Sequence, residues 1–232
     1  MKKIINGKRI TDFVTEFLLI VVGILVALQI ENWNDERKSQ SFKNKTLSQI
    51  KSALKRDVEH FNNRIRRLES ISESVGLIAE HLEKELPESD IFASEFSRIS
   101  WSLVLETRTA AYESLKSSGL DAIKSSELKV NLINVYDYIY PRLNWFLENK
   151  FNKFNDLYAT PFLFRYFSLE KEAGDENPVW NTQLYQQLLN DKKALTLLYR
   201  KQRQIHELKL EIQLALTEIE KLLSSIDNET QL

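Results

Sequence analysis

An uncharged apolar run near the N-terminus constrains this chain more than any other feature. Phe17–Ile30, FLLIVVGILVALQI, contains no charged residue, and apolar character extends back to Phe13 and forward to Trp33. The extended segment 13–34 has the length of about twenty residues that a membrane-spanning helix needs. Tryptophan is enriched at membrane interfaces. We therefore predict a transmembrane helix over 13–34, and the alternative is a helix buried in the core of a soluble protein.

The flanks of this run predict its orientation. Lys2, Lys3, Lys8 and Arg9 precede it, whereas acidic and basic residues are interleaved after it. Basic residues favour the cytoplasmic side, so we expect residues 1–12 to form a cytoplasmic tail and the bulk of the chain to lie outside. No cleavage site of small residues follows the run, which predicts an uncleaved signal anchor.

The composition excludes several classes of function. The formal net charge of the 232 residues is -1, so no basic surplus is available to neutralise nucleic-acid phosphates. A chain without cysteine has no disulfides, no thiolate metal sites and no cysteine nucleophile. Five glycines and four prolines are too few for the many turns of a β-sandwich or barrel. We expect an all-α fold.

A helical pattern follows the apolar run directly. No proline or glycine stands between Gly23 and Gly76, so one helix is predicted to run from the membrane to Leu86, where Pro87 would end it. One stripe of it is mostly apolar in steps of three and four residues, with a stutter at 50–58. The predicted stripe comprises Leu47, Ile50, Leu54, Val58, Phe61, Ile65, Leu68, Ser72, Val75, Ala79, Leu82 and Leu86.

Shorter segments are predicted in the middle of the chain from caps, glycines and prolines. They are a helix or helix pair over 91–105, a helix from 107 or 109 to 116, a long aromatic-rich helix over 128–158 that Pro141 should kink, an aromatic cluster at 161–167, a loop at 173–178 and a short helix over 182–189.

A last long helix is predicted after Asn190-Asp191. It should pair antiparallel with the first long helix, and the aromatic helix should complete a bundle over 35–226. Leu208 and Leu222 widen its apolar stripe, and the polar residues 227–232 should form a frayed tail. The predicted stripe comprises Leu195, Leu198, Gln202, Ile205, Lys209, Ile212, Leu216, Ile219, Leu223 and Ile226. The expected fold class is all-α, with a single N-terminal transmembrane helix that continues into an antiparallel bundle of long helices.

Two segments carry a resemblance. Residues 16–34 (EFLLIVVGILVALQIENWN) place an acidic residue before an I-V-x-G-I-L-x-A-L-Q-I-x-x-W-N run, and residues 110–120 (AAYESLKSSGL) contain Y-x-x-L-K-x-S-G. In both, the chain resembles a bacterial family of unknown function with one N-terminal transmembrane helix. The resemblance implies membrane anchoring and an all-helical body, and it implies no activity. With the predicted orientation, we expect a single-pass protein of the bacterial cytoplasmic membrane.

One side of the predicted anchor is a candidate packing face. At 100° per residue, Glu16, Gly23, Ala27 and Glu31 lie on one side, and Gly23 and Ala27 have the spacing that lets two membrane helices approach closely. Carboxylates within a span normally face a partner or water. We expect a homo-oligomeric contact here. The alternatives are that Glu16 lies at the headgroup level, or that it carries protons or cations.

A second candidate is a recognition turn. Arg108, Tyr112, Lys116 and Gly119 surround the end of a predicted helix, where the two cations could receive an anionic ligand. The structural alternative is that Tyr112 and Leu115 bury one helix face while Gly119 ends the helix.

The remaining patterns predict no chemistry. The three histidines match no metal-ligand spacing, and the chain has no phosphate-binding glycine loop or nucleophile elbow. We therefore expect no enzyme, no cofactor and no metal. The predicted role is a membrane-anchored helical scaffold or interaction protein, homo-oligomeric, with the lipid bilayer and an unidentified protein as partners. The alternative is a sensor or channel-like assembly. The aromatic cluster at 161–167 is expected in the core, with an exposed docking patch as the alternative.

Overall fold

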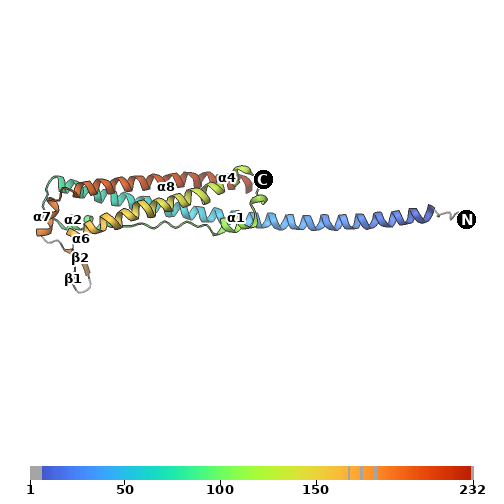
Figure 1. The fold of residues 1–232 in the computed structure, drawn as a ribbon, viewed down its shortest axis with the longest axis horizontal. Helices are drawn as coiled ribbons and strands as arrows, with labels where there is room; N and C mark the ends of the chain where they lie inside the picture. The colour runs from blue at the N-terminus through green and yellow to red at the C-terminus, as the bar shows by residue number, and fades with distance from the viewer. Residues whose placement is uncertain (1–6, 167, 173–174, 180–181, 231–232) are drawn as a thin grey trace.

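The first helix organises the whole molecule. The computed structural model describes residues 7–166, 168–172, 175–179 and 182–230. Helix α1 (Gly7–Glu83) projects as a lone rod over its N-terminal part and then enters a bundle of helices, which we call the body, residues 43–230 (Figure 1). The absence of proline and glycine between Gly23 and Gly76 explains this continuity.

Helix α1 ends three residues before the predicted position. Glu85 takes a left-handed conformation with φ 50°, and the Leu86 N–H donates to the His81 carbonyl at 3.1 Å. This pattern closes a helix before Pro87 could disrupt it. Leu86 therefore lies outside the helix and is 40% exposed, so its place in the stripe was wrong.

Between Leu47 and Leu82 the predicted stripe of α1 is buried except at Val58, Ile65 and Ser72, which are only partly buried. Asp57 is fully buried where the stutter was predicted, and Val58 is only partly buried. With Asp57 in the stripe, the steps through Ile50, Leu54 and Phe61 become four, three and four. The regular pattern therefore continues, and the stutter was wrong.

Helix α8 (Ala194–Thr230) packs antiparallel on α1, as predicted (Figure 1). Contacts between the two helices run in opposite order along the chain. They join Lys43 to Glu229, Ser72 to Gln202 and Glu83 to Tyr199.

The buried stripe of α8 is shifted from the predicted one. Five of the predicted positions, from Leu198 to Ile226, are buried, but Leu195, Gln202, Lys209, Leu216 and Leu223 are only partly buried. The other half of the stripe consists of residues one position earlier. The observed stripe is Ala194, Leu198, Lys201, Ile205, Leu208, Ile212, Ala215, Ile219, Leu222 and Ile226. Leu208 and Leu222 are therefore at its centre.

An extended strap follows two short helices. After α2 (Asp90–Ser97) and the 3-10 turn η1 (Arg98–Ser100), residues 101–109 form no helix, contrary to the helix or helix pair predicted through 105. Leu103 and Leu105 are buried while Val104 is exposed, as in an extended chain against a core. The strap leads to α3 (Ala110–Ser118) and the 3-10 turn η2 (Leu120–Ala122).

The aromatic helix runs without a break from Ser126 to Tyr166. The Ser125 side chain caps it by accepting from the Leu128 N–H at 3.1 Å. It alternates α-helical and wider π-helical segments, and η3 ends directly before Tyr140-Pro141, where a wider turn relieves the clash of the proline ring. The segments are α4 (Ser126–Ile133), η3 (Asn134–Ile139), α5 (Tyr140–Phe146), η4 (Leu147–Asn152), η5 (Asn155–Ala159) and α6 (Thr160–Tyr166).

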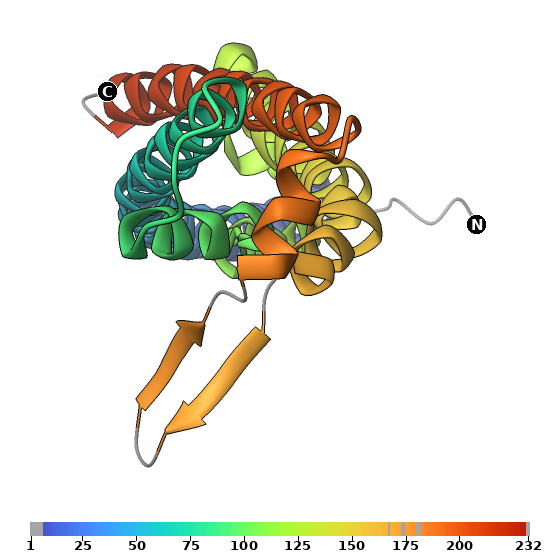
Figure 2. The ribbon, with the colours of Figure 1, turned by 90° about the vertical axis from the view of Figure 1, so that its left-hand side faces the viewer.

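A small hairpin projects from the end of the bundle (Figure 2). Strands β1 (Ser168–Glu172) and β2 (Asp175–Val179) pair antiparallel. The predicted loop at 173–178 was wrong for 175–178, which lie in β2, whereas 173–174 lie outside the described residues. Helix α7 (Thr182–Leu189) confirms the short helix predicted there.

The aromatic cluster divides between core and surface. Phe162, Leu163 and Tyr166 are buried in α6, as expected for core residues. Phe164 is 66% exposed, and Phe167 lies outside the described residues.

Candidate functional site

No other residue that the structure describes covers the projecting part of α1. The side chains of residues 13–39 are exposed apart from Val21, and Phe17, Leu19 and Ile24 have exposed fractions of 58%, 69% and 56%. This helix is long and apolar enough to cross a membrane, and none of its most apolar window is buried in the body. The alternative of a helix buried in the chain's own core is therefore wrong.

The candidate packing face lies on this uncovered segment. Glu16, Gly23, Ala27 and Glu31 are all exposed, and a Cβ atom placed on Gly23 would meet nothing within 4 Å. The structure thus leaves this face open, and a contact with a second copy stays a prediction.

Two ion pairs fix the end of the body nearest the projecting segment. Lys43 Nζ lies 3.0 Å from Glu229 Oε1, with both side chains at most 7% exposed, and Lys51 pairs with Asp227. These contacts hold the end of α8 against α1. Residues 227–230 therefore belong to the helix and not to the expected frayed tail, while 231–232 lie outside the described residues.

A buried carboxylate ties the strap to the core. Asp57 accepts hydrogen bonds from the Tyr140 hydroxyl at 2.7 Å, from the Arg108 guanidinium at 2.6 Å and from the Arg108 backbone N–H at 3.3 Å. The fully buried carboxylate therefore has a cation and two further donors, as a buried charge requires. Burial and the nearby carboxylate raise the pKa of Tyr140 well above its ordinary value.

Side chains from two helices satisfy the backbone of the strap. Asn152 accepts from the Leu103 N–H at 3.3 Å and donates to the Leu103 carbonyl at 3.0 Å, as a neighbouring strand would. Asn155 donates to the Trp101 carbonyl at 3.0 Å, and the His60 ring accepts from the Glu106 N–H at 3.3 Å. Because backbone groups beside a core need partners, these side chains explain why an extended chain is stable here.

The predicted recognition turn is assembled around Asp137. Its carboxylate accepts from the Tyr112 hydroxyl at 2.9 Å and from Lys116 Nζ at 2.8 Å. Lys116 and Tyr112 hold the pKa of Asp137 below its ordinary value, while burial is the first cause of a raised pKa at Tyr112. The Tyr112 and Tyr136 rings stack 4.4 Å apart, and Tyr136 Oη is buried without a hydrogen-bond partner among the described residues.

This geometry favours the structural interpretation of the turn. Arg108 and Lys116 each pair with a carboxylate of the same chain, so neither cation is held open for an anion. Tyr112 and Leu115 are buried, and Gly119 ends α3 with φ 94°. A Cβ on Gly119 would meet no atom within 4 Å, so the backbone conformation alone requires glycine.

Sequence reasoning missed a buried lysine in the core. Lys201 is fully buried, its ammonium contacts the Asn155 side-chain oxygen, and it lies 4.2 Å from the centre of the Phe151 ring. Burial lowers the pKa of Lys201 to about 7. The signal was present in the sequence, because the three-four steps of α8 pass through position 201. Together with Asn155, Lys201 links α8 to the strap.

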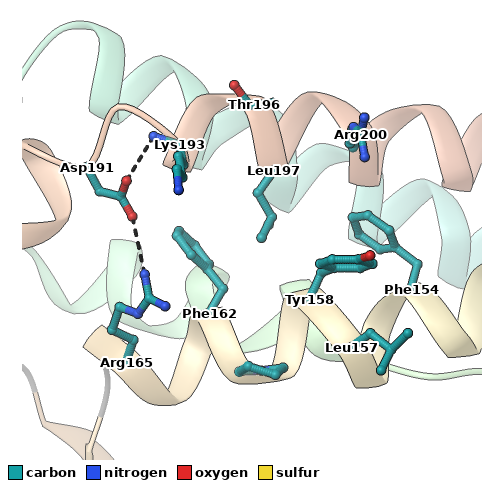
Figure 3. Close-up of a pocket in the computed structure, with 11 residues that line it drawn as sticks. Phe154, Leu157, Tyr158, Phe162, Arg165, Asp191, Lys193, Thr196, Leu197 and Arg200 are labelled. Atoms are coloured by element: carbon teal, nitrogen blue, oxygen red, sulfur yellow. Dashed lines mark hydrogen bonds and ion pairs between the residues drawn. The ribbon is translucent and has the colours of Figure 1, made fainter.

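An open groove lies between the aromatic helix and the first turns of α8 (Figure 3). Its volume is about 470 Å³. Phe154, Tyr158 and Phe162 point from the aromatic helix toward α8, and Leu197 points back from α8 (Figure 3). Basic side chains stand at its edges. We call it the distal groove, and it is lined by Phe154, Leu157, Tyr158, Pro161, Phe162, Arg165, Asp191, Lys193, Thr196, Leu197 and Arg200.

Comparison with known proteins places the chain in a family. The model of the family of unknown function DUF6090 matches residues 16–175, from the projecting part of α1 to the hairpin, and so includes both segments that carry the resemblance. No curated protein and no solved structure matches the chain. Because the match covers more than half of its length, the protein belongs to the DUF6090 family of unknown function.

Proposed function

We propose that this protein is a single-pass, membrane-anchored helical scaffold that assembles as a homo-oligomer. In this proposal residues 1–12 stay in the cytoplasm, the anchor segment, residues 13–34, crosses the bacterial cytoplasmic membrane, and the body lies outside. The observation that carries the proposal is the exposure of residues 13–34, whose apolar side chains are not covered by any other described part of the chain.

The energetics of exposure support a lipid environment. Apolar surface in water costs roughly 25 cal/mol for each Å² that could be buried. Phe17, Leu18, Leu19 and Ile20 are consecutive, so at 100° per residue they point to four sides of the helix, and all are more than half exposed. A single protein partner would cover only one side, whereas a bilayer surrounds the helix.

The small residues of the packing face support assembly. Gly23 and Ala27 are separated by one turn, and the space outside Gly23 is open. Lipid offers little reason for two helices to associate, so close packing over small residues is the usual source of attraction. When two copies meet through this face, each anchor helix would fill the open space beside Gly23 of the other.

The length of α1 supports a scaffolding role. From Asn34 to Glu83 the helix would extend roughly 75 Å from the membrane at 1.5 Å per residue. The end of the body that carries α2, α7 and the hairpin would then stand far from the lipid, where it could meet partners (Figure 1).

Single cysteines test anchoring and assembly, because the natural chain has none. We expect the full-length protein to sediment with vesicles, and G23C and A27C to crosslink in membranes more strongly than L25C and V26C. Equal yields on both faces would refute the packing face. For orientation, S48C should react with a membrane-impermeant thiol reagent in intact spheroplasts while K8C is protected, and the reverse result would invert the topology.

The continuity of α1 favours a second candidate, a sensor or channel-like assembly. One helix without proline or glycine between Gly23 and Gly76 joins the anchor to the core of the body, so a movement of the body would move the anchor. Ion flux through reconstituted vesicles that E16Q reduces would support a channel. Flux equal to that of empty vesicles would leave the scaffold as the better proposal.

A further inference from the structure

The distal groove combines an apolar floor with a basic edge. Phe162 is buried at its floor, while Leu157 and Tyr158 on its wall are more than half exposed. Its volume of about 470 Å³ lies within the range of small-molecule sites, which is roughly 300–1,000 Å³. The aromatic rings provide flat apolar surface for a chain or ring of a ligand.

Two cations at the edge of the groove are available to a ligand. In the part of the chain that the structure describes, no ion pair or side-chain hydrogen bond involves the ammonium of Lys193 or the guanidinium of Arg200. Both side chains are exposed and line the groove (Figure 3). An anion placed here could therefore accept charge-assisted hydrogen bonds without first breaking a bond within the protein.

The negative charge of the carboxylate in the lining is already compensated by groups of the protein. Asp191 accepts from the Tyr166 hydroxyl at 2.7 Å and from the Lys193 N–H at 2.8 Å, and it lies 3.9 Å from the Arg165 guanidinium. The hydrogen bond from Tyr166 is the first cause that holds the pKa of Asp191 below its ordinary value. With Arg165, Lys193 and Arg200 against this one acid, the groove carries a net positive charge.

The positive charge continues along α8. A neighbouring recess of about 390 Å³ shares Phe154 and Arg200 with the distal groove and adds Lys150 and Arg203. Its acid, Glu207, accepts from Arg203 at 2.8 Å. The field around the groove therefore favours an anion over a neutral or cationic ligand.

We propose that the distal groove binds a small amphipathic anion, namely a medium-chain carboxylate whose chain lies on Phe154, Tyr158, Phe162 and Leu197 while its carboxylate pairs with Arg200. Lys193, at the other end of the groove, adds to the positive field that attracts the anion (Figure 3). This goes beyond the proposed scaffold, because it gives the body a ligand of its own. The binding does not depend on the anchor.

The ligand would come from the aqueous phase and not from the bilayer around the anchor. The groove lies at the level of Ser72 and Glu83 of α1, which contact Gln202 and Tyr199 of α8. From Asn34 to Ser72 the helix spans roughly 57 Å at 1.5 Å per residue. In the proposed anchored state, a lipid of that bilayer cannot reach the groove.

Equilibrium dialysis of radiolabelled octanoate against the full-length protein tests the proposal. The protein is held in nanodiscs of zwitterionic lipid, and empty nanodiscs give the blank. We expect saturable binding of one octanoate per chain above the blank, and at least tenfold weaker binding of octanol, which has the same chain without the charge. No binding above the blank, or equal binding of octanol, would overturn the proposal.

Matched variants locate the site. K193E/R200E should weaken octanoate binding at least tenfold, whereas K55E/R56E, the same charge change on an exposed part of α1, should leave it unchanged. L197E should weaken binding by removing the apolar contact. Far-UV circular dichroism checks that each variant keeps its helices, and T196A serves as a mild change in the same lining. Unchanged binding in K193E/R200E and L197E would place the site elsewhere.

Two further measurements define the chemistry and the source. Inorganic phosphate at the same concentration should not displace octanoate. Displacement would show that the groove binds anions by charge alone, without a contribution from the apolar chain, and would overturn the proposal. The protein in nanodiscs of anionic lipid should bind octanoate as tightly as the protein in zwitterionic nanodiscs does. Loss of binding would point to lipid headgroups as the occupant of the groove. Failure of octanoate binding would leave vesicle sedimentation and crosslinking at Gly23 untouched, so the two proposals fail separately.

Discussion

The two halves of α1 are one helix with two different relations to the rest of the chain. In the body, residues 43–83 are apolar along one stripe, and α2, α3 and α8 cover that stripe. In the projecting half, residues 13–34 carry apolar side chains around most of the helix, and no other part of the chain that the structure describes covers them. A helix with one apolar face can be buried by its own chain, whereas a helix that is apolar all round needs surroundings from outside the chain.

The change between the halves is abrupt. Ser39 is exposed, and Lys43, one turn later, is 6% exposed in its ion pair with Glu229. This buried ion pair thus marks the start of the body.

Removal of residues 1–34 should have the largest effect. The full-length protein is expected to sediment almost entirely with vesicles, and the shortened chain should stay in the supernatant with its body still helical. Ultracentrifugation and far-UV circular dichroism provide the two measurements. A shortened chain that still sediments, or one that unfolds, would mean that the two halves are not independent in the way the exposure indicates.

Loss of the Asp57 carboxylate should destabilise the body and leave the anchor unaffected. Asp57→Ala leaves the Tyr140 hydroxyl and the Arg108 backbone N–H without an acceptor beside the core. The loss should lower the free energy of unfolding by roughly 2–4 kcal/mol. Urea unfolding of the full-length protein in nanodiscs measures this loss. Asp57→Asn keeps an acceptor for Tyr140 and should cost less. A change below about 0.5 kcal/mol in Asp57→Ala would contradict the role of the cluster.

Lys201 should make the stability of the body depend on pH. Because burial lowers its pKa from 10.5 to about 7, the unfolded chain binds more protons than the folded one above pH 7, so stability rises with pH in that range. Between pH 6 and pH 9 this group should add on the order of 2 kcal/mol. Lys201→Met removes the titrating group, and the gain in wild type beyond that in the variant isolates it. Equal gains would show that Lys201 titrates normally.

Two glycines, one in each half, should give the smallest effects. Gly76 lies on the exposed side of α1 with nothing within 4 Å of an added Cβ, so Gly76→Ala should stabilise the body by about 0.5–1 kcal/mol. Gly23→Ala should leave the urea midpoint unchanged and reduce self-association, because its methyl group enters the proposed helix contact. A shift of the midpoint in Gly23→Ala would show that the anchor contributes to the stability of the body.

The sequence predicted the long helices well because their signals are long and periodic. The course of α1, its antiparallel pairing with α8 and the short helix α7 followed from spacing and helix breakers. One error in each buried stripe has the same cause: Asp57 and Lys201 are charged, so these two positions were assigned to their neighbours Val58 and Gln202. Only the tertiary partners of these charges, Arg108 and Tyr140 for Asp57 and Asn155 for Lys201, make their burial acceptable.

The strap could not be predicted for a related reason. Its apolar residues lie close enough together to suggest a helix, and the choice between helix and extended chain is made by Asn152 and Asn155, about fifty residues later. In the candidate turn, Arg108 pairs with Asp57 and Lys116 pairs with Asp137, and both acids are distant in sequence. The distal groove has no sequence motif, because it forms between two helices.

The direction of α8 has a practical consequence. It brings Thr230 back to the end of the body where α1 leaves it, while the hairpin stands at the opposite end (Figure 1). Lys43, which pairs with Glu229 there, lies only about 14 Å along the helix from Asn34 at 1.5 Å per residue. If the chain is anchored as proposed, a dye near Thr230 would sample water close to the headgroups, and one on the hairpin would sample the far end of the same molecule. A lipid-bound quencher should then quench the dye near Thr230 more strongly than the dye on the hairpin, and the difference would report the height of each end of the body above the bilayer.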